Sequence, residues 1–593
     1  MRFLFFIGFF LGSFIYVNAQ SPALAKNYFE QGEFAKAKAI YQEIYQKNPQ
    51  NLSVAYSYIN TLQELEEYQT AEKIIREQLK LYKNYPNLYV ELGYNYQLQQ
   101  ETTKAKNAYQ EAIQELEKRP NYAYGVGKAF QKYNLLEEAI NAYSIALERS
   151  SNISARVELA KIYGEQLKHK KMFDTYIDVV KEQPNYLYVI HRSFAEYITD
   201  DKENTENKVL RQLLLERLQE EPLLLYNQLL SWLFIHEKNF KMAFIQEKAI
   251  YNREGKTNLQ AFFQLSEIAQ EQGDLKTSGE ILDYIITASP LPYVKIKAEE
   301  LRLQQQIDIA TAKDYPNITK NFEKVFTTYA PDENLFYIKL QHARFLAFKL
   351  SQTSQALTQL KQLLTADLSM RKEALLKMLL ADILVLDERY NQALIYYSQV
   401  QNLYENSPIG HEARYKVAKT SYYKGDFDWA KTQLDVLKTS TSQLIANDAL
   451  ELGLLIKSNT EEDSLQPALK KFAKADLLQF QEKYTDALTL LDTLLNQYKG
   501  YKIEDEAFFR KAKIHEHLKN YELAATYYEK IVAFYPEESL ADDALFALAK
   551  LHQEKLNQTT KAQEYYKRII FEYPNSLYVN EARKAYRENI PPT

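Results

Sequence analysis

The sequence of 593 residues contains no cysteine. This absence excludes disulfide bonds, thiolate metal ligands, cysteine nucleophiles and the lipid-bearing cysteine of bacterial lipoproteins. Glycine is also scarce, at 14 residues, which favours long helices over strands and loops. A basic excess is missing too: the net charge of −5 gives no support for nucleic acid as a partner, because nucleic-acid-binding domains usually carry a surplus of Lys and Arg.

The longest apolar run lies at the N-terminus. Arg2 supplies a positive start, Phe3 to Val17 form an apolar core, and Val17-Asn18-Ala19 offers a cleavage point before Gln20. This order predicts a secretory signal peptide at residues 1–19. An uncleaved membrane anchor is the alternative, although a spanning helix needs about 20 apolar residues and this run is shorter.

Long apolar runs are lacking in the rest of the chain. The most apolar candidate, Leu223 to Ile235, is interrupted by Asn227 and Gln228. We therefore expect no transmembrane segment once the signal peptide has been removed.

What the sequence does contain is an internal repeat. Alanine recurs four times at one constant interval, at Ala37, Ala71, Ala105 and Ala139. Two further series keep the same interval: Ala25, Ile59, Gly93 and Gly127, and the larger Tyr41, Ile75, Tyr109 and Tyr143. A period between about 20 and 50 residues is the signature of a solenoid or a similar array.

Each unit contains two helical patterns separated by a break. In the first unit the pattern runs through Leu24, Ala25, Tyr28, Gly32, Phe34, Ala37, Tyr41, Ile44 and Pro49. This order resembles the tetratricopeptide repeat, a helix–turn–helix unit of about 34 residues. Small side chains at Ala25 and Ala37 let two antiparallel helices approach closely, and Gly32 suits the turn between them. The resemblance implies an all-α protein, an α-solenoid of tetratricopeptide-type repeats wound into a right-handed superhelix.

Beyond the signal peptide, the repeat pattern divides the chain into three parts. Residues 20–184 hold five units and form an N-terminal array. Residues 185–330 keep the two-helix rhythm but have lost most of the motif, so we expect degenerate helical repeats there. Residues 331–593 form a C-terminal array with a charged capping helix, and its period is slightly longer, as the spacings of Ala381 and Ala418 and of Ala475, Ala512 and Ala549 indicate.

One interval of the C-terminal array is irregular. Ala418 and Ala475 are separated by about one and a half units instead of one. The surplus contains an extra helical pattern around Asn447 to Ile456.

The last repeats suggest a cellular compartment. The segments Phe571-Glu572-Tyr573-Pro574-Asn575-Ser576 and Glu581-Ala582-Arg583 resemble the last repeats of periplasmic proteins that serve outer-membrane β-barrel assembly and the Tol–Pal system. Together with the signal peptide, this resemblance predicts a periplasmic protein associated with an outer-membrane or envelope complex. A secreted protein is the alternative.

No group of residues points to catalysis. Gly125-Val126-Gly127-Lys128 has Tyr122 and Ala129 where a phosphate-binding loop needs glycine and Ser or Thr. His515-Glu516-His517 places its histidines about 200° apart on a helix, whereas zinc pairs on a helix use a spacing of four residues. We therefore expect no enzyme activity, no cofactor and no metal.

A recurring pair of residues suggests a binding surface. In tetratricopeptide-like proteins the first helix of each unit lines the concave surface, and positions five and nine point into the groove. We count the small residue of that helix as position eight. An aromatic residue and a lysine then occupy these positions in Tyr124 and Lys128, Tyr415 and Lys419, Phe509 and Lys513, and Phe546 and Lys550. These pairs could stack on side chains and bind carboxylates of a peptide or protein, or the lysine stems could simply cover aromatic rings.

These observations predict a scaffold that binds partner proteins or extended peptides in a concave groove. A role as an adaptor in cell-envelope or outer-membrane assembly is the first hypothesis. Capture of a secreted peptide or glycan by the aromatic and lysine-lined groove is the alternative.

Overall fold

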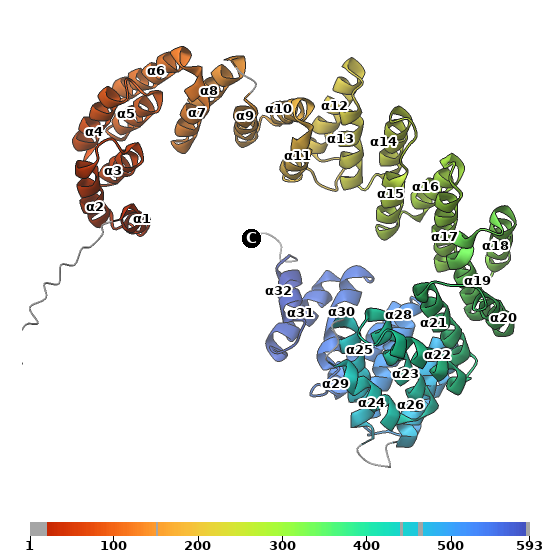
Figure 1. The fold of residues 1–593 in the computed structure, drawn as a ribbon. Coiled ribbons are helices and arrows are strands. Elements are labelled where there is room, and N and C mark those ends of the chain that lie inside the picture. The colour runs from red at the N-terminus through yellow and green to blue at the C-terminus, as the bar shows by residue number, and fades with distance from the viewer. Residues whose placement is uncertain (1–20, 150–151, 439–442, 461–465, 589–593) are drawn as a thin grey trace, which may run out of the picture. The chain divides into compact units, whose positions relative to one another are not determined.

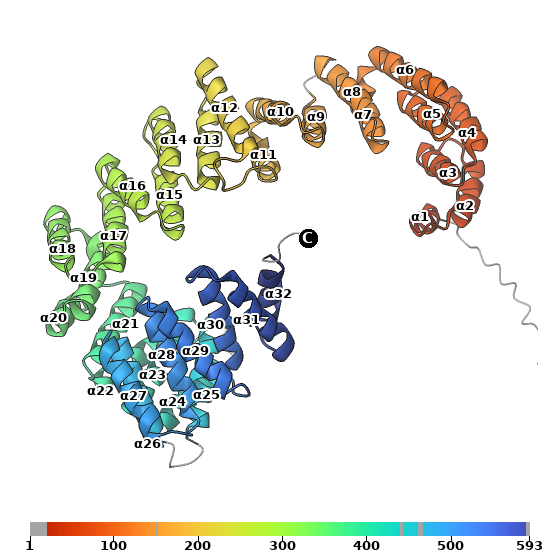
Figure 2. The ribbon, with the colours of Figure 1, turned by 180° about the vertical axis from the view of Figure 1, so that it is seen from behind.

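The computed structural model describes residues 21–149, 152–438, 443–460 and 466–588. In these ranges the chain forms helices joined by turns and no strand, and most helices follow one another as antiparallel pairs (Figures 1 and 2). The all-α solenoid of tetratricopeptide-type repeats is confirmed. The predicted signal peptide, residues 1–19, lies outside the described residues.

The chain divides into two compact units, residues 1–281 and 282–593, and each is described by itself. The helices of the first unit are α1 (Pro22–Glu30), α2 (Phe34–Lys47), α3 (Leu52–Glu64), α4 (Tyr68–Leu81), α5 (Pro86–Leu98), α6 (Thr102–Lys118), η1 (Pro120–Tyr122), α7 (Ala123–Lys132), α8 (Leu136–Arg149), α9 (Ile153–Glu165), α10 (His169–Glu182), η2 (Pro184–Tyr186), α11 (Leu187–Phe194), α12 (Thr205–Glu220), α13 (Leu224–His236), α14 (Phe240–Arg253) and α15 (Gln260–Glu271). Helix α16 (Leu275–Ala288) contains the boundary, which falls inside the predicted middle part, residues 185–330. The division into three parts stays a prediction.

The second unit continues the succession of helices. They are α17 (Pro292–Ile309), α18 (Tyr315–Tyr329), η3 (Glu333–Leu335), α19 (Phe336–Phe348), α20 (Thr353–Leu363), α21 (Met370–Leu386), α22 (Tyr390–Leu403), α23 (Pro408–Lys424), α24 (Phe427–Leu437), α25 (Gln443–Ser458), α26 (Gln466–Phe480), α27 (Tyr484–Gln497), α28 (Ile503–His517), α29 (Tyr521–Phe534), α30 (Ala541–Glu554), α31 (Thr559–Glu572) and α32 (Val579–Glu588).

The recurring small residues lie at the contacts between the helices of a pair. Ala37, Ala71, Ala105 and Ala139 are all buried. A methyl group added to Gly93 on α5 would overlap the ring of Tyr109 on α6, and one added to Gly127 on α7 would overlap the ring of Tyr143 on α8. The sequence predicts this close approach, because only a residue without a bulky side chain leaves room for the ring.

The turn inside the first four units has one backbone conformation. One residue at this turn in each unit has φ between 56° and 77°: Gly32, Glu66, Gln100 and Asn134. Of these four units, only the first has glycine at this position, although a non-glycine residue costs roughly 1 kcal/mol when its φ is positive. The packing of the two helices therefore determines the backbone conformation of the turn. Glycine adopts this conformation easily, but the turn does not require it.

The second unit departs from a simple succession of repeats at α26. This helix packs against α23, although α24 and α25 lie between the two in the sequence. Leu477 of α26 is buried in the core formed by α19 to α23, and Lys474 forms an ion pair of 2.7 Å with Glu388 in the turn after α21. Just after α26, Glu482 forms an ion pair of 2.6 Å with Lys349, which follows α19. Helix α26 therefore lies across the first helices of earlier repeats.

Candidate binding surface

The four predicted lysines each lie close to a carboxylate of the same chain. The ion pairs are Lys128 with Glu158 at 2.8 Å, Lys419 with Asp476 at 3.5 Å, Lys513 with Glu516 at 3.4 Å, and Lys550 with Glu581 at 3.0 Å. Three of the four cations remain substantially exposed, since the side chains of Lys128, Lys513 and Lys550 expose 44%, 42% and 43% of their surface. Exposed ion pairs contribute little to stability, so a stronger carboxylate ligand can compete for these lysines.

Two of the predicted aromatic–lysine pairs form direct contacts. The Lys513 ammonium lies 5.5 Å from the centre of the Phe509 ring, and the Lys550 ammonium lies 4.9 Å from that of Phe546. These distances are typical of cation–π contacts. Phe546 also stacks on Tyr578, the residue just before α32, with ring centres 4.2 Å apart.

The other two pairs are arranged differently. Lys419 lies over Tyr422 and Tyr423, at 5.0 and 5.5 Å, instead of over Tyr415. Lys128 reaches across to α9, while Tyr124 approaches Tyr143 with ring centres 6.2 Å apart. Tyr124 and Lys128 belong to the first unit, and the other six residues belong to the second. All eight remain predicted binding residues.

A buried aspartate on α26 organises the centre of the second unit. Asp476 is only 4% exposed and accepts a hydrogen bond from the Tyr422 hydroxyl at 3.2 Å. Its Oδ1 atom lies 2.8 Å from Nε of Arg510, but the two atoms are not aligned as a hydrogen bond. Lys419 therefore approaches a carboxylate that is already engaged by a tyrosine and an arginine, and burial lowers the pKa of Lys419.

Acidic groups of α28 adjoin this aspartate network. Burial, with the nearby charge of Asp505, raises the pKa of Glu506 to about 8. Burial likewise raises the pKa of Asp505 to about 6. Both carboxyl groups therefore change their charge at pH values close to neutral, in a region where charges of both signs meet.

Three ion pairs that join one repeat to the next share a pattern that sequence reasoning missed. Position nine of a first helix pairs with position six of the following first helix, as in Lys128 with Glu158, Asp382 with Lys416 at 2.7 Å, and Asp476 with Arg510. The last two pairs have the same separation in the sequence, three residues less than the repeat length of the C-terminal array. A search for opposite charges at this interval, instead of for lysine alone, would have found them.

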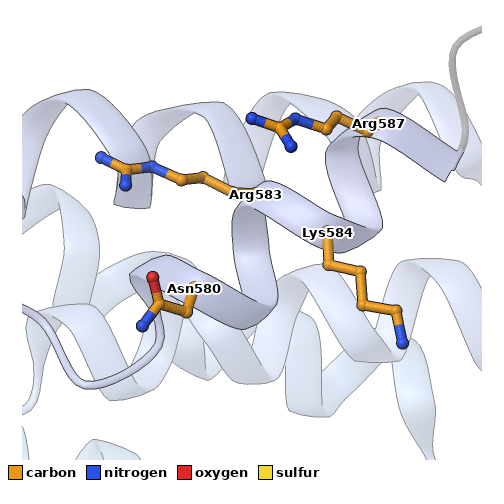
Figure 3. Close-up of a pocket in the computed structure, with 4 residues that line it drawn as sticks. All are labelled: Asn580, Arg583, Lys584 and Arg587. Atoms are coloured by element: carbon orange, nitrogen blue, oxygen red, sulfur yellow. The ribbon is translucent and has the colours of Figure 1, made fainter. Parts of the chain in front are cut away.

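The C-terminal helix carries a basic surface of its own. An open depression of about 500 Å³ is lined by Asn580, Arg583, Lys584 and Arg587 of α32. Arg583 and Arg587 are one helical turn apart and extend in the same direction (Figure 3). The donors of this surface suit carboxylates, because a guanidinium group can hold both oxygens of one carboxylate.

In the part of the chain that the structure describes, no cluster of three or more His, Asp or Glu residues could hold a metal ion. Within the same residues, no helix has both the length and the apolar character that crossing a membrane requires.

Paired helices, closed by small residues and stacked one repeat after another, define a helical repeat protein of the solenoid class. Three segments match family models of the tetratricopeptide repeat, at residues 28–90, 472–539 and 543–576. The chain therefore contains tetratricopeptide repeats, as the sequence pattern predicts. Proteins built from these repeats are generally scaffolds for protein–protein interaction and not catalysts, and protein partners are the class of ligand to expect here.

Other comparisons are less informative. The chain is similar to a chain of the solved structure entitled "Structure of Naa15/Naa10 bound to HypK-THB", with 13% identity, 96% of both chains covered and a TM-score of 0.26. It is also similar to a chain of "Crystal structure of APC/C hetero-tetramer Cut9-Hcn1", with 12% identity, 97% and 99% coverage and a TM-score of 0.23. Scores this low carry no argument about the present chain. The comparison with curated proteins gave no match.

Proposed function

We propose that this chain is an exported scaffold that binds partner proteins or extended peptides along the first helices of its repeats, in cell-envelope or outer-membrane assembly. The observation that carries the proposal is the pair of adjacent contacts on α28 and α30, Lys513 over Phe509 and Lys550 over Phe546. Each contact offers an exposed cation beside an aromatic ring, so it suits a peptide with carboxylate and apolar groups. A groove that is already folded binds with little ordering cost.

The periplasm is the proposed compartment, because the sequence begins with the features of a secretory signal and lacks cysteine. Fractionation of cells that produce the full chain tests this step. Recovery of the mature chain in the periplasmic fraction is the expected result, while recovery in the culture medium would support the secreted alternative. Recovery in the cytoplasm with the N-terminal signal sequence intact would contradict both.

A pulldown from envelope fractions tests the binding surface. The chain with alanine at Phe509, Lys513, Phe546 and Lys550 should recover its envelope partner about 5- to 30-fold less well than the unaltered chain, if each of the two aromatic–lysine sites contributes about 0.5–1 kcal/mol to partner binding. Lys419 is unsuitable for this test, because removing it disturbs the buried Asp476 network.

Lys530→Ala is the matched control. Lys530 lies on α29, the second helix of a repeat, and its ammonium is 5.3 Å from the ring of Phe508. Lys530 therefore places a lysine over a phenylalanine ring, as Lys513 does, but from a helix that is not expected to line the groove. Equal recovery by the fourfold variant and the control would contradict the proposed surface. Recovery of a secreted peptide or glycan in place of an envelope protein would favour the alternative function.

A further inference from the structure

Helix α25 is the first helix of a repeat. Gly453 follows Ala418 by slightly less than one repeat length of this array, which puts it at position eight. Positions four, seven and eleven are then Ala449, Leu452 and Ile456, which are buried against the preceding helices. Glu451 at position six lies close enough to Lys419 at position nine of α23 for their charges to interact, and other successive repeats form ion pairs between these two positions.

The second helix of this repeat is missing from the described residues. In complete repeats the glycine at position eight is covered by a tyrosine of the second helix, as Gly93 is by Tyr109 and Gly127 by Tyr143. In the described chain nothing lies within 4 Å of the place that a Cβ atom on Gly453 would take. The next described helix, α26, is the first helix of the following repeat and pairs with α27.

The face of α25 that a second helix would cover is apolar and open. Leu450 and Leu454 flank Gly453 on one side of the helix and are 46% and 49% exposed. Ala446 lies one turn before Leu450 on the same face. The helix thus combines two leucines with two small residues that allow close approach, on a surface that corresponds to the interior of a helix pair in the complete repeats.

We propose that the open face of α25 binds one amphipathic helix of a partner protein, which completes the repeat and places an aromatic ring on Gly453. The second helices of this chain define the chemistry of that partner. Helix α6, which covers Gly93, carries Ala105 and, four residues later, Tyr109. The partner helix should accordingly present a small residue followed at a spacing of four by tyrosine or phenylalanine. The proposal rests on the proposed function only in assuming a protein partner, and it concerns a surface separate from Phe509, Lys513, Phe546 and Lys550.

A peptide with the sequence of residues 102–118 is the probe. We expect it to bind the purified full chain saturably in isothermal titration calorimetry, with one strong site. Gly453→Leu in the chain fills the place of the aromatic ring and should weaken this site at least about tenfold, and Tyr109→Ala in the peptide should have the same effect. Leu450→Asp should also abolish the site, because it puts a charge into the apolar contact.

Leu444→Asp is the matched control on the same helix. Leu444 is 72% exposed and, being six residues before Leu450, lies about 120° away around the helix. It should leave peptide binding unchanged. Gly453→Leu meets open space in the unbound chain, so circular dichroism and thermal unfolding should show an intact fold.

Three results would overturn the inference. The first is an absence of saturable peptide binding at millimolar concentration, and the second is binding that Gly453→Leu leaves unchanged. The third is a dimer of the full chain that Leu450→Asp dissociates, since the open face would then take a second copy of the chain. None of these results affects the envelope pulldown, so failure here is distinguishable from failure of the proposed function.

Discussion

Two glycines of this chain should respond in opposite directions to the same substitution. Gly127 of α7 and Gly453 of α25 both occupy position eight of a first helix, but Gly127 faces the ring of Tyr143 and Gly453 faces open space. Replacing a helical glycine by alanine gains about 0.8–1 kcal/mol of helix propensity at either site. Any difference between the stability changes caused by the two substitutions therefore measures the contact with the second helix.

The contact at Gly127 leaves no room for a methyl group. An added Cβ atom would overlap the ring of Tyr143, which is fully buried and donates a hydrogen bond of 2.6 Å from its hydroxyl to Gln131. Overpacking of this kind costs about 1–3 kcal/mol. After the gain in propensity, Gly127→Ala should destabilise its helix pair by about 0–2 kcal/mol, whereas Gly453→Ala should stabilise α25 by about 0.8–1 kcal/mol.

Amide hydrogen exchange is the appropriate assay, because the stability of a repeat array is approximately a sum of local terms. Protection should fall in α7 and α8 for Gly127→Ala and rise in α25 for Gly453→Ala, while the helices of the other unit stay unchanged. Equal responses at the two sites would refute the reasoning, since they would mean that the tyrosine ring does not close the helix pair or that α25 is already covered.

Three further predictions concern other parts of the chain. Ala105→Leu should destabilise the first unit by about 1–3 kcal/mol through overpacking, and an unchanged urea midpoint would mean that the helices do not cross there. The Glu506 pKa of about 8 lies above the usual value of 4.5, so the folded chain retains a proton that the unfolded chain has lost, and stability should fall as pH rises from about 5 to 8. Glu506→Gln should flatten this slope in urea titrations at several pH values, and a slope unaltered by the substitution would contradict the assignment. Lys416→Met should cost about 1–3 kcal/mol by removing the closest cation from the buried Asp382, and the double variant Asp382→Asn, Lys416→Met should recover part of that loss.

Much of the fold could be predicted from the sequence, because it depends on residues close together in the chain. Two antiparallel helices approach most closely where a side chain is small, so Gly93, Gly127 and the recurring alanines indicate the pairs of the regular repeats before any coordinates are known. The extra helix near Asn447 to Ile456 could be predicted for the same reason. For the candidate binding residues, the sequence indicated a helical face but not the carboxylates of this chain that pair with the lysines.

The other features of the fold depend on contacts between repeats. The sequence by itself determined the helix pairs, their period and the surplus helix, because these follow from steric fit within a single repeat. Only the tertiary structure decided that α26 lies on α23, that Asp476 meets both Lys419 and Arg510, and that no described ring covers Gly453. Each of these depends on the path that the chain takes between distant repeats, and a periodic pattern of small residues does not contain that path.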